Sequence, residues 1–274
     1  MVWVIKATGE KEPFSREKVM RTCLRAGAER ESAERIADEI ASQVRDGMTT
    51  KHILKMALRL LAQTEEPHVV ARYDLKGAIM RLGPAGFPFE TFFSEILNEY
   101  GYSTKLRQIL SGFCVSHEID VVAEKDGGRS MIECKYRNSS GDYISVKEAL
   151  YTYARFLDLN EGKKERFDSV WLVTNTKFSE DALRYGTCKG MKLIGWGYPK
   201  GGSLREMVES KGLYPITVLR TLDSASQRRF AAANIMMCKH ATQLSLDELY
   251  EKTAVPKRKL AAILDEANQV CENV

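Results

Sequence analysis

The amino-acid sequence predicts three consecutive parts: an α+β N-terminal domain over residues 1–84, an α/β core with a mixed central sheet over 85–200, and a helical region over 201–274. Two short apolar stretches near the N-terminus precede a series of helical patterns, as in a small α+β domain. A hairpin motif at residues 117–135 is followed by alternating strand and helix patterns, which favour parallel strands covered by helices on both faces. After residue 201 the apolar spacing is helical.

The N-terminal domain is expected to begin with two short strands and to continue with helices. The strands are Val2 to Lys6 and Lys11 to Phe14. Ser15 then has the side chain of a helix N-cap, and apolar residues recur at helical spacing after it. Three further helices are expected over 33–44, 50–62 and 69–82, the last ending at Gly83-Pro84. Many small α+β domains would show this pattern.

Several short motifs in this domain resemble the ATP-cone family. They are Val4-Ile5-Lys6 before Gly9, Pro13 to Lys18, Asp46 to Thr50, and Val70 to Tyr73. The resemblance implies a regulatory domain that binds ATP or dATP, with Lys6, Lys18 and Thr50 at the positions that contact the nucleotide. Lysine ammonium groups are suited to a triphosphate. A cone that does not bind nucleotide would instead be a docking module.

The core is expected to begin with a helix from Phe89 and to carry a tight hairpin. Asp126-Gly127 lies between two apolar runs, which is the strongest short signal for a two-residue type I′ turn. With this loop, Asp120 lies opposite Glu133, and Lys135 returns to the same face because side chains alternate along a strand. A Gly127-Gly128 loop would instead oppose Asp120 with Lys135 on one face. A three-residue loop would break the arrangement unless a bulge restored it.

Two neighbouring carboxylates and a lysine are suited to phosphodiester hydrolysis. Because like charges repel at this distance, one carboxyl must bind a proton or a cation must lie between them. Mg²⁺ prefers oxygen ligands and keeps open positions for water and phosphate. A lysine on the same face can orient the attacking water or neutralise charge on the reacting phosphate. The alternative is a solvated sheet face with a weak surface ion pair.

The same residues resemble the PD-(D/E)xK nuclease superfamily, and within it the Mrr-like restriction endonucleases. Asp120 and Glu133-Cys134-Lys135 carry the motif, and a helix with Phe89-Glu90 followed by Gly101 matches the start of that family's fold. The resemblance spans roughly residues 85–200. It implies Asp120, Glu133, Lys135 and Glu90 as catalytic residues. It also implies Asp120 and Glu133 as ligands of Mg²⁺ or Mn²⁺, and DNA as the substrate.

The remainder of the core is expected to alternate between helices and strands. Ser145 begins a capping box for a helix to about Leu159, whose sheet-packing face is predicted to be Ala149, Leu150, Tyr153, Ala154 and Leu157. Lys147 and Tyr151 on its first turns could contact DNA phosphates or could be solvated surface residues. The later elements are a buried strand over 169–174, a helix over 179–186 and a strand over 191–196.

The C-terminal region is expected to form helices at 204–211, 224–238 and 245–270, the last interrupted near Pro256. The final two helical segments resemble a helix-turn-helix or helix-hairpin-helix in outline. Lys257, Arg258 and Lys259 cluster at a helix N-terminus, where phosphate binding would be favourable. The region is therefore a candidate for DNA binding, with packing or dimerisation as the alternative.

Composition limits the remaining possibilities. The net charge of +4 gives no obvious basic stripe, so DNA affinity would have to come from local clusters, the metal and a second subunit. No apolar run is long enough to span a membrane, and the N-terminus does not read as a signal peptide, so a cytoplasmic location is expected. Six cysteines without CxxC spacing are interpreted as buried reduced thiols. His117 is expected to point away from Asp120 and to be structural or a DNA contact.

The sequence therefore predicts a metal-dependent DNA endonuclease, and regulation by ATP or dATP binding to the N-terminal domain is expected. A homodimer is expected because one active site cuts one strand. The alternative is a nucleotide-sensing DNA-binding regulatory protein without nuclease activity. A nuclease selective for junctions or flaps would share the same chemistry.

Overall fold

The computed structural model of the protein describes residues 2–83, 87–162, 164 and 166–272. The chain forms two compact units. Unit 1 comprises Met1–Arg81, Ser139–Gly141 and Tyr214–Val274, and unit 2 comprises Leu82–Asn138 and Asp142–Leu213. Residues 201–213, which the sequence groups with the C-terminal region, belong to unit 2. The predicted boundary at residues 84–85 lies outside the described residues. No helix in the described part of the chain is long and apolar enough to cross a membrane.

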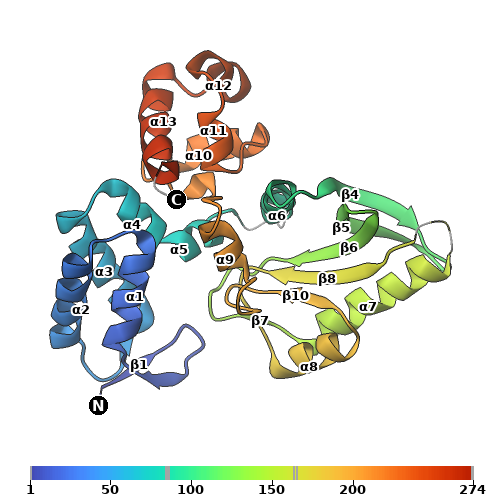
Figure 1. The fold of residues 1–274 in the computed structure, drawn as a ribbon, viewed down its shortest axis with the longest axis horizontal. Coiled ribbons are helices and arrows are strands. Elements are labelled where there is room, and N and C mark those ends of the chain that lie inside the picture. Colours follow the sequence, from blue (N-terminus) through green and yellow to red (C-terminus); the bar gives the residue numbers. More distant parts are fainter. Residues whose placement is uncertain (1, 84–86, 163, 165, 273–274) are drawn as a thin grey trace. The chain divides into compact units, whose positions relative to one another are not determined.

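The N-terminal part of unit 1 contains the predicted strand pair and helices (Figure 1). Its elements are β1 (Trp3–Ile5), β2 (Lys11–Pro13), α1 (Arg16–Ala26), α2 (Arg30–Gln43), β3 (Met48–Thr49), α3 (Thr50–Thr64), α4 (Pro67–Tyr73) and α5 (Leu75–Met80). Ser15 caps α1 as predicted, because its side chain accepts a hydrogen bond from the backbone N–H of Lys18. The sheet has the order β2-β1-β3, and its third strand was not predicted. The single helix predicted over 69–82 is wrong: it is two helices, separated at Asp74.

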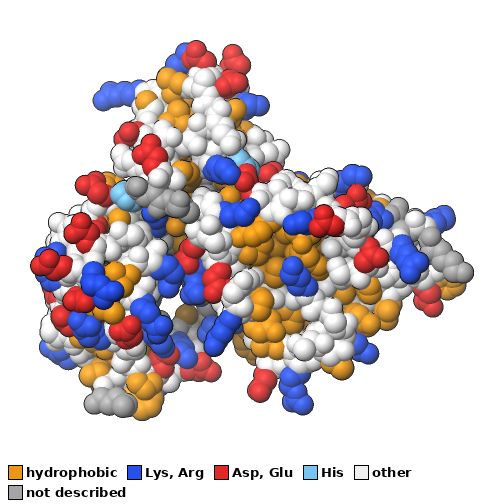
Figure 2. Space-filling model, in the orientation of Figure 1, with side chains coloured by type: hydrophobic (Ala, Val, Ile, Leu, Met, Phe, Trp, Pro, Cys, Tyr) orange, Lys and Arg blue, Asp and Glu red, His pale blue; other side chains and the backbone are white. Residues whose placement is uncertain are grey.

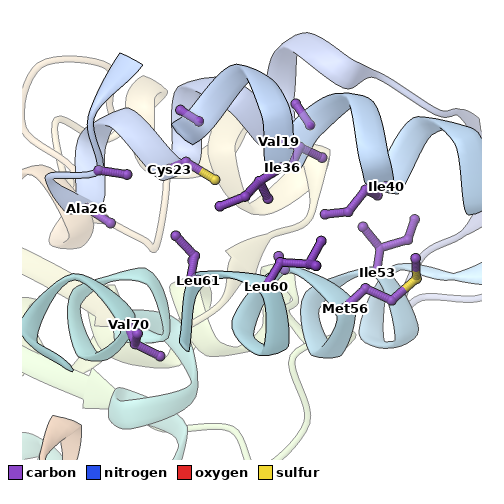
Figure 3. Close-up of a cluster of buried hydrophobic side chains, with 14 of the residues drawn as sticks. Val19, Cys23, Ala26, Ile36, Ile40, Ile53, Met56, Leu60, Leu61 and Val70 are labelled. Atoms are coloured by element: carbon purple, nitrogen blue, oxygen red, sulfur yellow. The ribbon is translucent and has the colours of Figure 1, made fainter. Parts of the chain in front are cut away.

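A hydrophobic core holds helices α1 to α4 together. Figure 3 shows side chains from these four helices pointing toward one another. They include Cys23 from α1, Ile40 from α2, Leu61 from α3 and Val70 from α4, all of them buried. Within each helix the buried residues recur at helical spacing, and this is why the periodicity of the sequence predicted these helices.

The C-terminal part of unit 1 is helical and packs against the N-terminal part. Its elements are η1 (Ile216–Val218), α10 (Ser224–Ala232), α11 (Cys238–Thr242), α12 (Leu246–Thr253) and α13 (Lys257–Cys271). The predicted helix over 224–238 is interrupted, because Asn234 adopts a left-handed backbone conformation with φ of 56°. Arg72 of α4 donates hydrogen bonds to the carbonyl of Val270, at 2.6 Å from Nη2 and 3.2 Å from Nε. Thr217 donates to the carbonyl of Ala78 at 2.7 Å.

Unit 2 is built on a five-stranded mixed sheet with the order β10-β8-β6-β5-β4. Its elements are α6 (Phe87–Glu99), β4 (Ser103–Ser111), β5 (Ser116–Lys125), β6 (Gly128–Lys135), β7 (Tyr143–Ile144), α7 (Val146–Glu161), β8 (Ser169–Thr174), β9 (Lys177–Phe178), α8 (Glu180–Cys188), β10 (Lys192–Ile194) and α9 (Leu204–Glu209). The predicted parallel pairing of β6, β8 and β10 is confirmed. In Figure 1, α7 and α8 lie on one side of this sheet and α6 on the other.

Helix α7 presents a different face to the sheet from the one predicted. Its buried residues are Ala149, Thr152, Arg155 and Leu159. Leu150 and Leu157, which were predicted to pack on the sheet, are 45% and 49% exposed. The prediction was wrong because hydrophobic periodicity assigns a charged residue such as Arg155 to the solvent side. Arg155 is buried because it is ion-paired with the buried carboxylate of Glu133.

The turn between β4 and β5 is fixed to α7 by Asp158. Its carboxylate accepts hydrogen bonds from the backbone N–H groups of Cys114 and Val115, and lies 2.7 Å from His117 Nε2. The Cys114 N–H and the His117 ring hold the pKa of Asp158 at about 2, well below its usual value. His117 thus has a structural contact, one of the two roles expected for it. Among the six cysteines, Cys114 and Cys188 are exposed free thiols and Cys271 is half-buried, so the expectation of six buried thiols is wrong for these three.

Replacing Asp158 by alanine is expected to lower the thermal stability of the protein at neutral pH. Because the folded-state pKa lies below the unfolded value of 3.8, the stabilisation is complete above pH 4 and disappears as the pH falls through 2. The difference in Tm between wild type and Asp158→Ala should therefore be constant from pH 5 to 8 and shrink below pH 4. Asp142→Ala, on an exposed loop, is the control. A difference that grows on acidification would contradict the role assigned to this carboxylate.

Candidate active site

The hairpin of β5 and β6 has the predicted two-residue loop. Asp126 and Gly127 have φ values of 50° and 77°, as a type I′ turn requires. Lys125 pairs with Gly128, and the ladder continues to Val121 opposite Ile132. Asp120 directly precedes Val121 in β5, and its carboxylate accepts a hydrogen bond from the backbone N–H of Cys134 at 2.7 Å. The register therefore places Asp120 beside the end of β6 that carries Glu133 and Lys135.

Glu133 is the most deeply buried carboxylate of the site, with 2% of its surface exposed. Its Oε1 forms a short ion pair with Lys135 Nζ, and its Oε2 lies 2.5 Å from Nη1 of Arg155. The second terminal nitrogen of Arg155, Nη2, donates to the carbonyl of Glu118 on β5. A buried carboxylate requires such compensation, since an unpaired charge in the interior is strongly unfavourable. This pairing explains why α7 turns a charged face toward the sheet.

Glu90 of α6 is a further buried carboxylate, with 7% of its surface exposed. Its Oε2 lies 3.6 Å from Nη1 of Arg107, which comes from β4 and has a positive φ of 50°. Burial raises the pKa of Glu90 although Arg107 opposes this shift. Glu133 contributes a further, smaller increase through its negative charge. The electrostatic influence of Glu133 therefore extends to Glu90.

The electrostatics of the site favour uptake of positive charge. Burial, followed by the negative charge of Glu133, raises the pKa of Asp120 to about 7. Burial alone would lower the pKa of Lys135, but the charges of Glu133 and Asp120 outweigh it, so the pKa of Lys135 is raised and its ammonium stays protonated. Asp120 and Glu133 thus share a region from which water is largely removed, and a cation there would relieve their repulsion.

These residues fit a hard divalent cation. The donor set is carboxylate oxygen, which Mg²⁺ and Mn²⁺ prefer, and Mg²⁺ needs only one or two protein carboxylates. Buried Glu90 Oε2 has no hydrogen-bond partner among the described residues, which leaves an oxygen for a water or an ion. The described residues contain no group of three or more His, Cys, Asp or Glu side chains placed to hold a metal ion by themselves. A metal held by Asp120 and Glu133 would therefore keep positions open for substrate, and it would supply a polarised phosphate and an activated water.

Two residues of the site were not found from the sequence. Arg107 lies on β4, a strand that was not predicted because its apolar residues do not alternate clearly and Ile109 is 75% exposed. Arg155 lies in the predicted helix but on the face predicted to be exposed. A charged residue at the centre of an otherwise apolar helix face was the available signal for it.

Of the two weaker candidates on α7, Tyr151 lies next to a residue of this site. Lys147 and Tyr151 are both exposed, and the guanidinium of Arg155 lies 5.4 Å from the centroid of the Tyr151 ring. Tyr151 therefore continues the site outward from Glu133 through Arg155. Contact of either residue with DNA stays a prediction.

In unit 1 the structure brings together the residues predicted to bind nucleotide. Lys6 Nζ and Lys18 Nζ lie 3.3 Å and 3.1 Å from the same oxygen, Oε2 of Glu12. Thr50 is the first residue of α3 and directly follows Thr49, which pairs with Ile5 across the parallel strands. Lys6 and Thr50 therefore leave neighbouring strands at the same point. Glu12 holds the two ammonium groups where an anionic ligand would be expected to bind them.

The basic cluster at the start of α13 is largely paired with acids. Lys257 Nζ lies 2.6 Å from Asp247 Oδ1, and Lys259 Nζ lies 2.5 Å from Asp223 Oδ2. Arg258 is exposed. Figure 2 shows acidic and basic side chains interspersed over the N-terminal helices on the face drawn, in keeping with the small net charge. The proposed DNA contacts of this cluster stay a prediction.

Comparison with known proteins shows similarity along most of the chain. Family models match an ATP cone domain over residues 2–75, a restriction endonuclease domain of the Mrr catalytic type over 85–196, and an AF1548-like C-terminal domain over 214–271. An uncharacterized protein of Archaeoglobus fulgidus is 44% identical over 177 residues, covering 65% of this chain and 98% of that protein. A second uncharacterized protein of that organism is 52% identical over 40 residues, or 15% of this chain and 85% of that protein. The crystal structure of AF1548, a protein of unknown function, has a TM-score of 0.61 and 40% identity, covering 69% of this chain and all of that chain.

Proposed function

The chain belongs to the same family as AF1548 and joins an ATP-cone domain to a restriction endonuclease domain of the Mrr type, and from this premise we propose that it is a metal-dependent DNA endonuclease regulated by ATP or dATP. The observation that carries the proposal is the set of buried Glu133 with half-buried Asp120 and Lys135 at one end of the β5–β6 hairpin. Removing charged groups wholly or partly from water in this way is costly, and it is typical of a site that uses them.

Each residue of the site has a chemical task in the proposed hydrolysis. Asp120 and Glu133 hold the divalent cation, Mg²⁺ or Mn²⁺. The Lys135 ammonium, which stays protonated, donates a hydrogen bond to the attacking water or to a non-bridging phosphate oxygen as negative charge develops there. Arg155 fixes the carboxylate plane of Glu133 by holding one of its oxygens. Glu90, whose Oε2 is ion-paired with Arg107 but has no hydrogen-bond partner among the described residues, would complete the site by holding a water.

The ATP-cone domain is proposed to act as the sensor of nucleotide. Lys6 and Lys18 would release Glu12 and bind the triphosphate, with Thr50 contributing its hydroxyl. The ligand can change nuclease activity only by binding one conformation or oligomeric state better than the other. A homodimer is part of the proposal, because two sites related by a two-fold axis would cut both strands of a duplex.

The direct test is nicking and linearisation of supercoiled plasmid in Mg²⁺ or Mn²⁺. Wild-type protein should cut, and both Asp120→Ala and Lys135→Ala should lose at least about 10² of the rate. Each protein is assayed without nucleotide, with ATP and with dATP, and a change in the wild-type rate would support the sensor role. EDTA should abolish the cutting.

A second candidate function is a nucleotide-sensing, DNA-binding regulator without hydrolysis. It is favoured by one observation: both oxygens of Glu133 are paired with cationic side chains, Lys135 and Arg155. Such a cluster could be structural. Wild type and variants that are equally inactive under every nucleotide condition, yet still bind DNA, would support this function and reject the nuclease.

Replacing Glu12 by glutamine is expected to increase the affinity for ATP by about threefold to tenfold. The Glu12 carboxylate competes with the triphosphate for Lys6 and Lys18, and glutamine lacks the charge. Binding is measured by isothermal titration calorimetry at fixed ionic strength. Glu31→Gln, which removes the charge of an exposed acid on α2, serves as the control. A weaker affinity in Glu12→Gln would mean that the carboxylate positions the lysines and does not compete for them.

A further inference from the structure

Unit 1 contains a pocket that neither the nuclease site nor the expected nucleotide site explains. Its volume is about 570 Å³, within the range of small-molecule sites. It lies between the C-terminal half of α3, helix α4 and the segment that follows η1. Arg59 on α3 is nine residues beyond Thr50, roughly 13 Å along the helix axis, so the pocket is separate from the Lys6, Lys18 and Thr50 site.

Three arginines from three separate parts of the chain line this pocket: Arg59, Arg81 and Arg220. Asp74 is the acid among the lining residues, and it is paired with Arg81 at 2.8 Å. The side chains of Arg59 and Arg220 form no hydrogen bond or ion pair with the described residues, and both are exposed to solvent. Arg59 and Arg220 thus line one pocket without acidic partners, and guanidinium groups of this kind are suited to a phosphate, which each can bind through two parallel hydrogen bonds.

The segment that carries Arg220 is held in place before any ligand binds. The buried carboxylate of Glu266 accepts hydrogen bonds from the backbone N–H of Arg220 at 2.8 Å and of Thr221 at 2.9 Å. It also accepts one from the Thr221 hydroxyl at 2.7 Å. On the other side, Arg81 Nη2 donates to the carbonyl of Thr217 at 3.1 Å. Because the segment is anchored at both points, ordering it would cost a ligand little entropy.

The remainder of the pocket is apolar. Its other lining residues are Leu58, Ala62, Val70, Ala71, Val218, Leu219 and Leu222. A bare phosphate could use the arginines but not this surface, whereas a phosphorylated ligand with a flat, weakly polar group could use both. We infer that the pocket binds a nucleoside phosphate, with its phosphates at Arg59 and Arg220 and its base on the apolar surface. The ligand would contact both the ATP-cone domain and the C-terminal segment.

The test is isothermal titration calorimetry of ATP into the full-length chain. Wild type should bind two ATP molecules. Lys6→Ala/Lys18→Ala should retain one, and adding Arg59→Glu and Arg220→Glu to that background should weaken the remaining binding by at least about tenfold. Arg30→Glu/Arg228→Glu, a matched change of charge on exposed residues of unit 1, is the control and should leave it unaltered. Inorganic triphosphate should bind the Lys6→Ala/Lys18→Ala protein at least about tenfold more weakly than ATP does, because it lacks the base.

The outcomes separate this site from the expected nucleotide site. If Lys6 and Lys18 do not bind nucleotide, wild type and Lys6→Ala/Lys18→Ala will bind one ATP with equal affinity, and the pocket still stands. The inference is overturned if the Lys6→Ala/Lys18→Ala protein binds no ATP, or if its remaining binding is insensitive to Arg59→Glu/Arg220→Glu. Equal affinity for ATP and triphosphate would also overturn it, because the apolar surface would then contribute nothing. Circular dichroism confirms that each variant is folded.

Discussion

Replacing Asp120 by asparagine is expected to abolish DNA cleavage, by at least about 10³ in rate, and at the same time to raise the stability of the metal-free protein. The folded-state pKa of Asp120 is raised from 3.8 to about 7 by burial and by Glu133. Unfolding therefore releases a proton between these values, and stability falls as the pH rises from 4 to 7. At pH 8 the carboxyl is ionised in both states, and the loss of folding stability caused by its ionisation is complete. Asparagine removes the charge, while its amide oxygen can still accept the hydrogen bond from Cys134 N–H.

The measurement is Tm in EDTA at pH 8 and at pH 5, alongside plasmid cleavage with Mn²⁺. We expect Asp120→Asn to gain on the order of 2 kcal/mol at pH 8 and much less at pH 5, where the wild-type carboxyl is already neutral. Asp126→Asn, in the exposed turn of the same hairpin, is the matched control and should change neither quantity. A lower Tm of Asp120→Asn at pH 8 would contradict the unfavourable ionisation of Asp120 in the metal-free protein. Retained cleavage would contradict its role as a metal ligand.

Replacing Arg155 by methionine is expected to destabilise the metal-free protein by about 3–5 kcal/mol, the range for breaking a buried ion pair. Methionine preserves most of the side-chain volume, so the loss reports the removed charge. Glu133 then keeps only Lys135 as a cationic partner, and the carbonyl of Glu118 loses its donor. Because a divalent cation can replace the missing guanidinium charge, Mn²⁺ should raise the Tm of Arg155→Met more than that of wild type.

Thermal unfolding without DNA, at increasing Mn²⁺ concentration, measures this difference without relying on activity. Arg21→Met breaks an exposed pair with Glu17 on α1 and should cost no more than about 1 kcal/mol. Its response to Mn²⁺ should equal that of wild type. Equal metal responses in all three proteins would exclude Glu133 as a metal ligand.

The centre of the candidate site could be predicted because its information is local. The Asp-Gly turn sets the register, and the register fixes which side chains of β5 and β6 share a face. Asp120, Glu133 and Lys135 are all within ten residues of that turn, so no long-range contact was needed to bring them together.

The remainder of the site depends on contacts that a sequence does not display. Strand β4 carries Arg107, but it is an edge strand that pairs through β5, and its pattern of burial is irregular. Arg155 is buried only because Glu133 lies across from it on another element. In both cases a charged residue is stabilised by a distant partner, whereas periodicity assigns charged residues to solvent.

Unit 1 combines segments from the beginning and the end of the chain, and this affects the order in which the domains can fold during synthesis. The buried Arg72 is bonded to Val270, so the N-terminal helices cannot complete their contacts until the last helix has left the ribosome. All of unit 2 emerges before that point, and domains generally fold as they are synthesised. A nascent chain can therefore complete the restriction-endonuclease domain while the ATP-cone domain still lacks its contacts with α13. A chain terminated early, after residue 213, would carry every proposed catalytic residue but not the part of unit 1 that closes on Arg72.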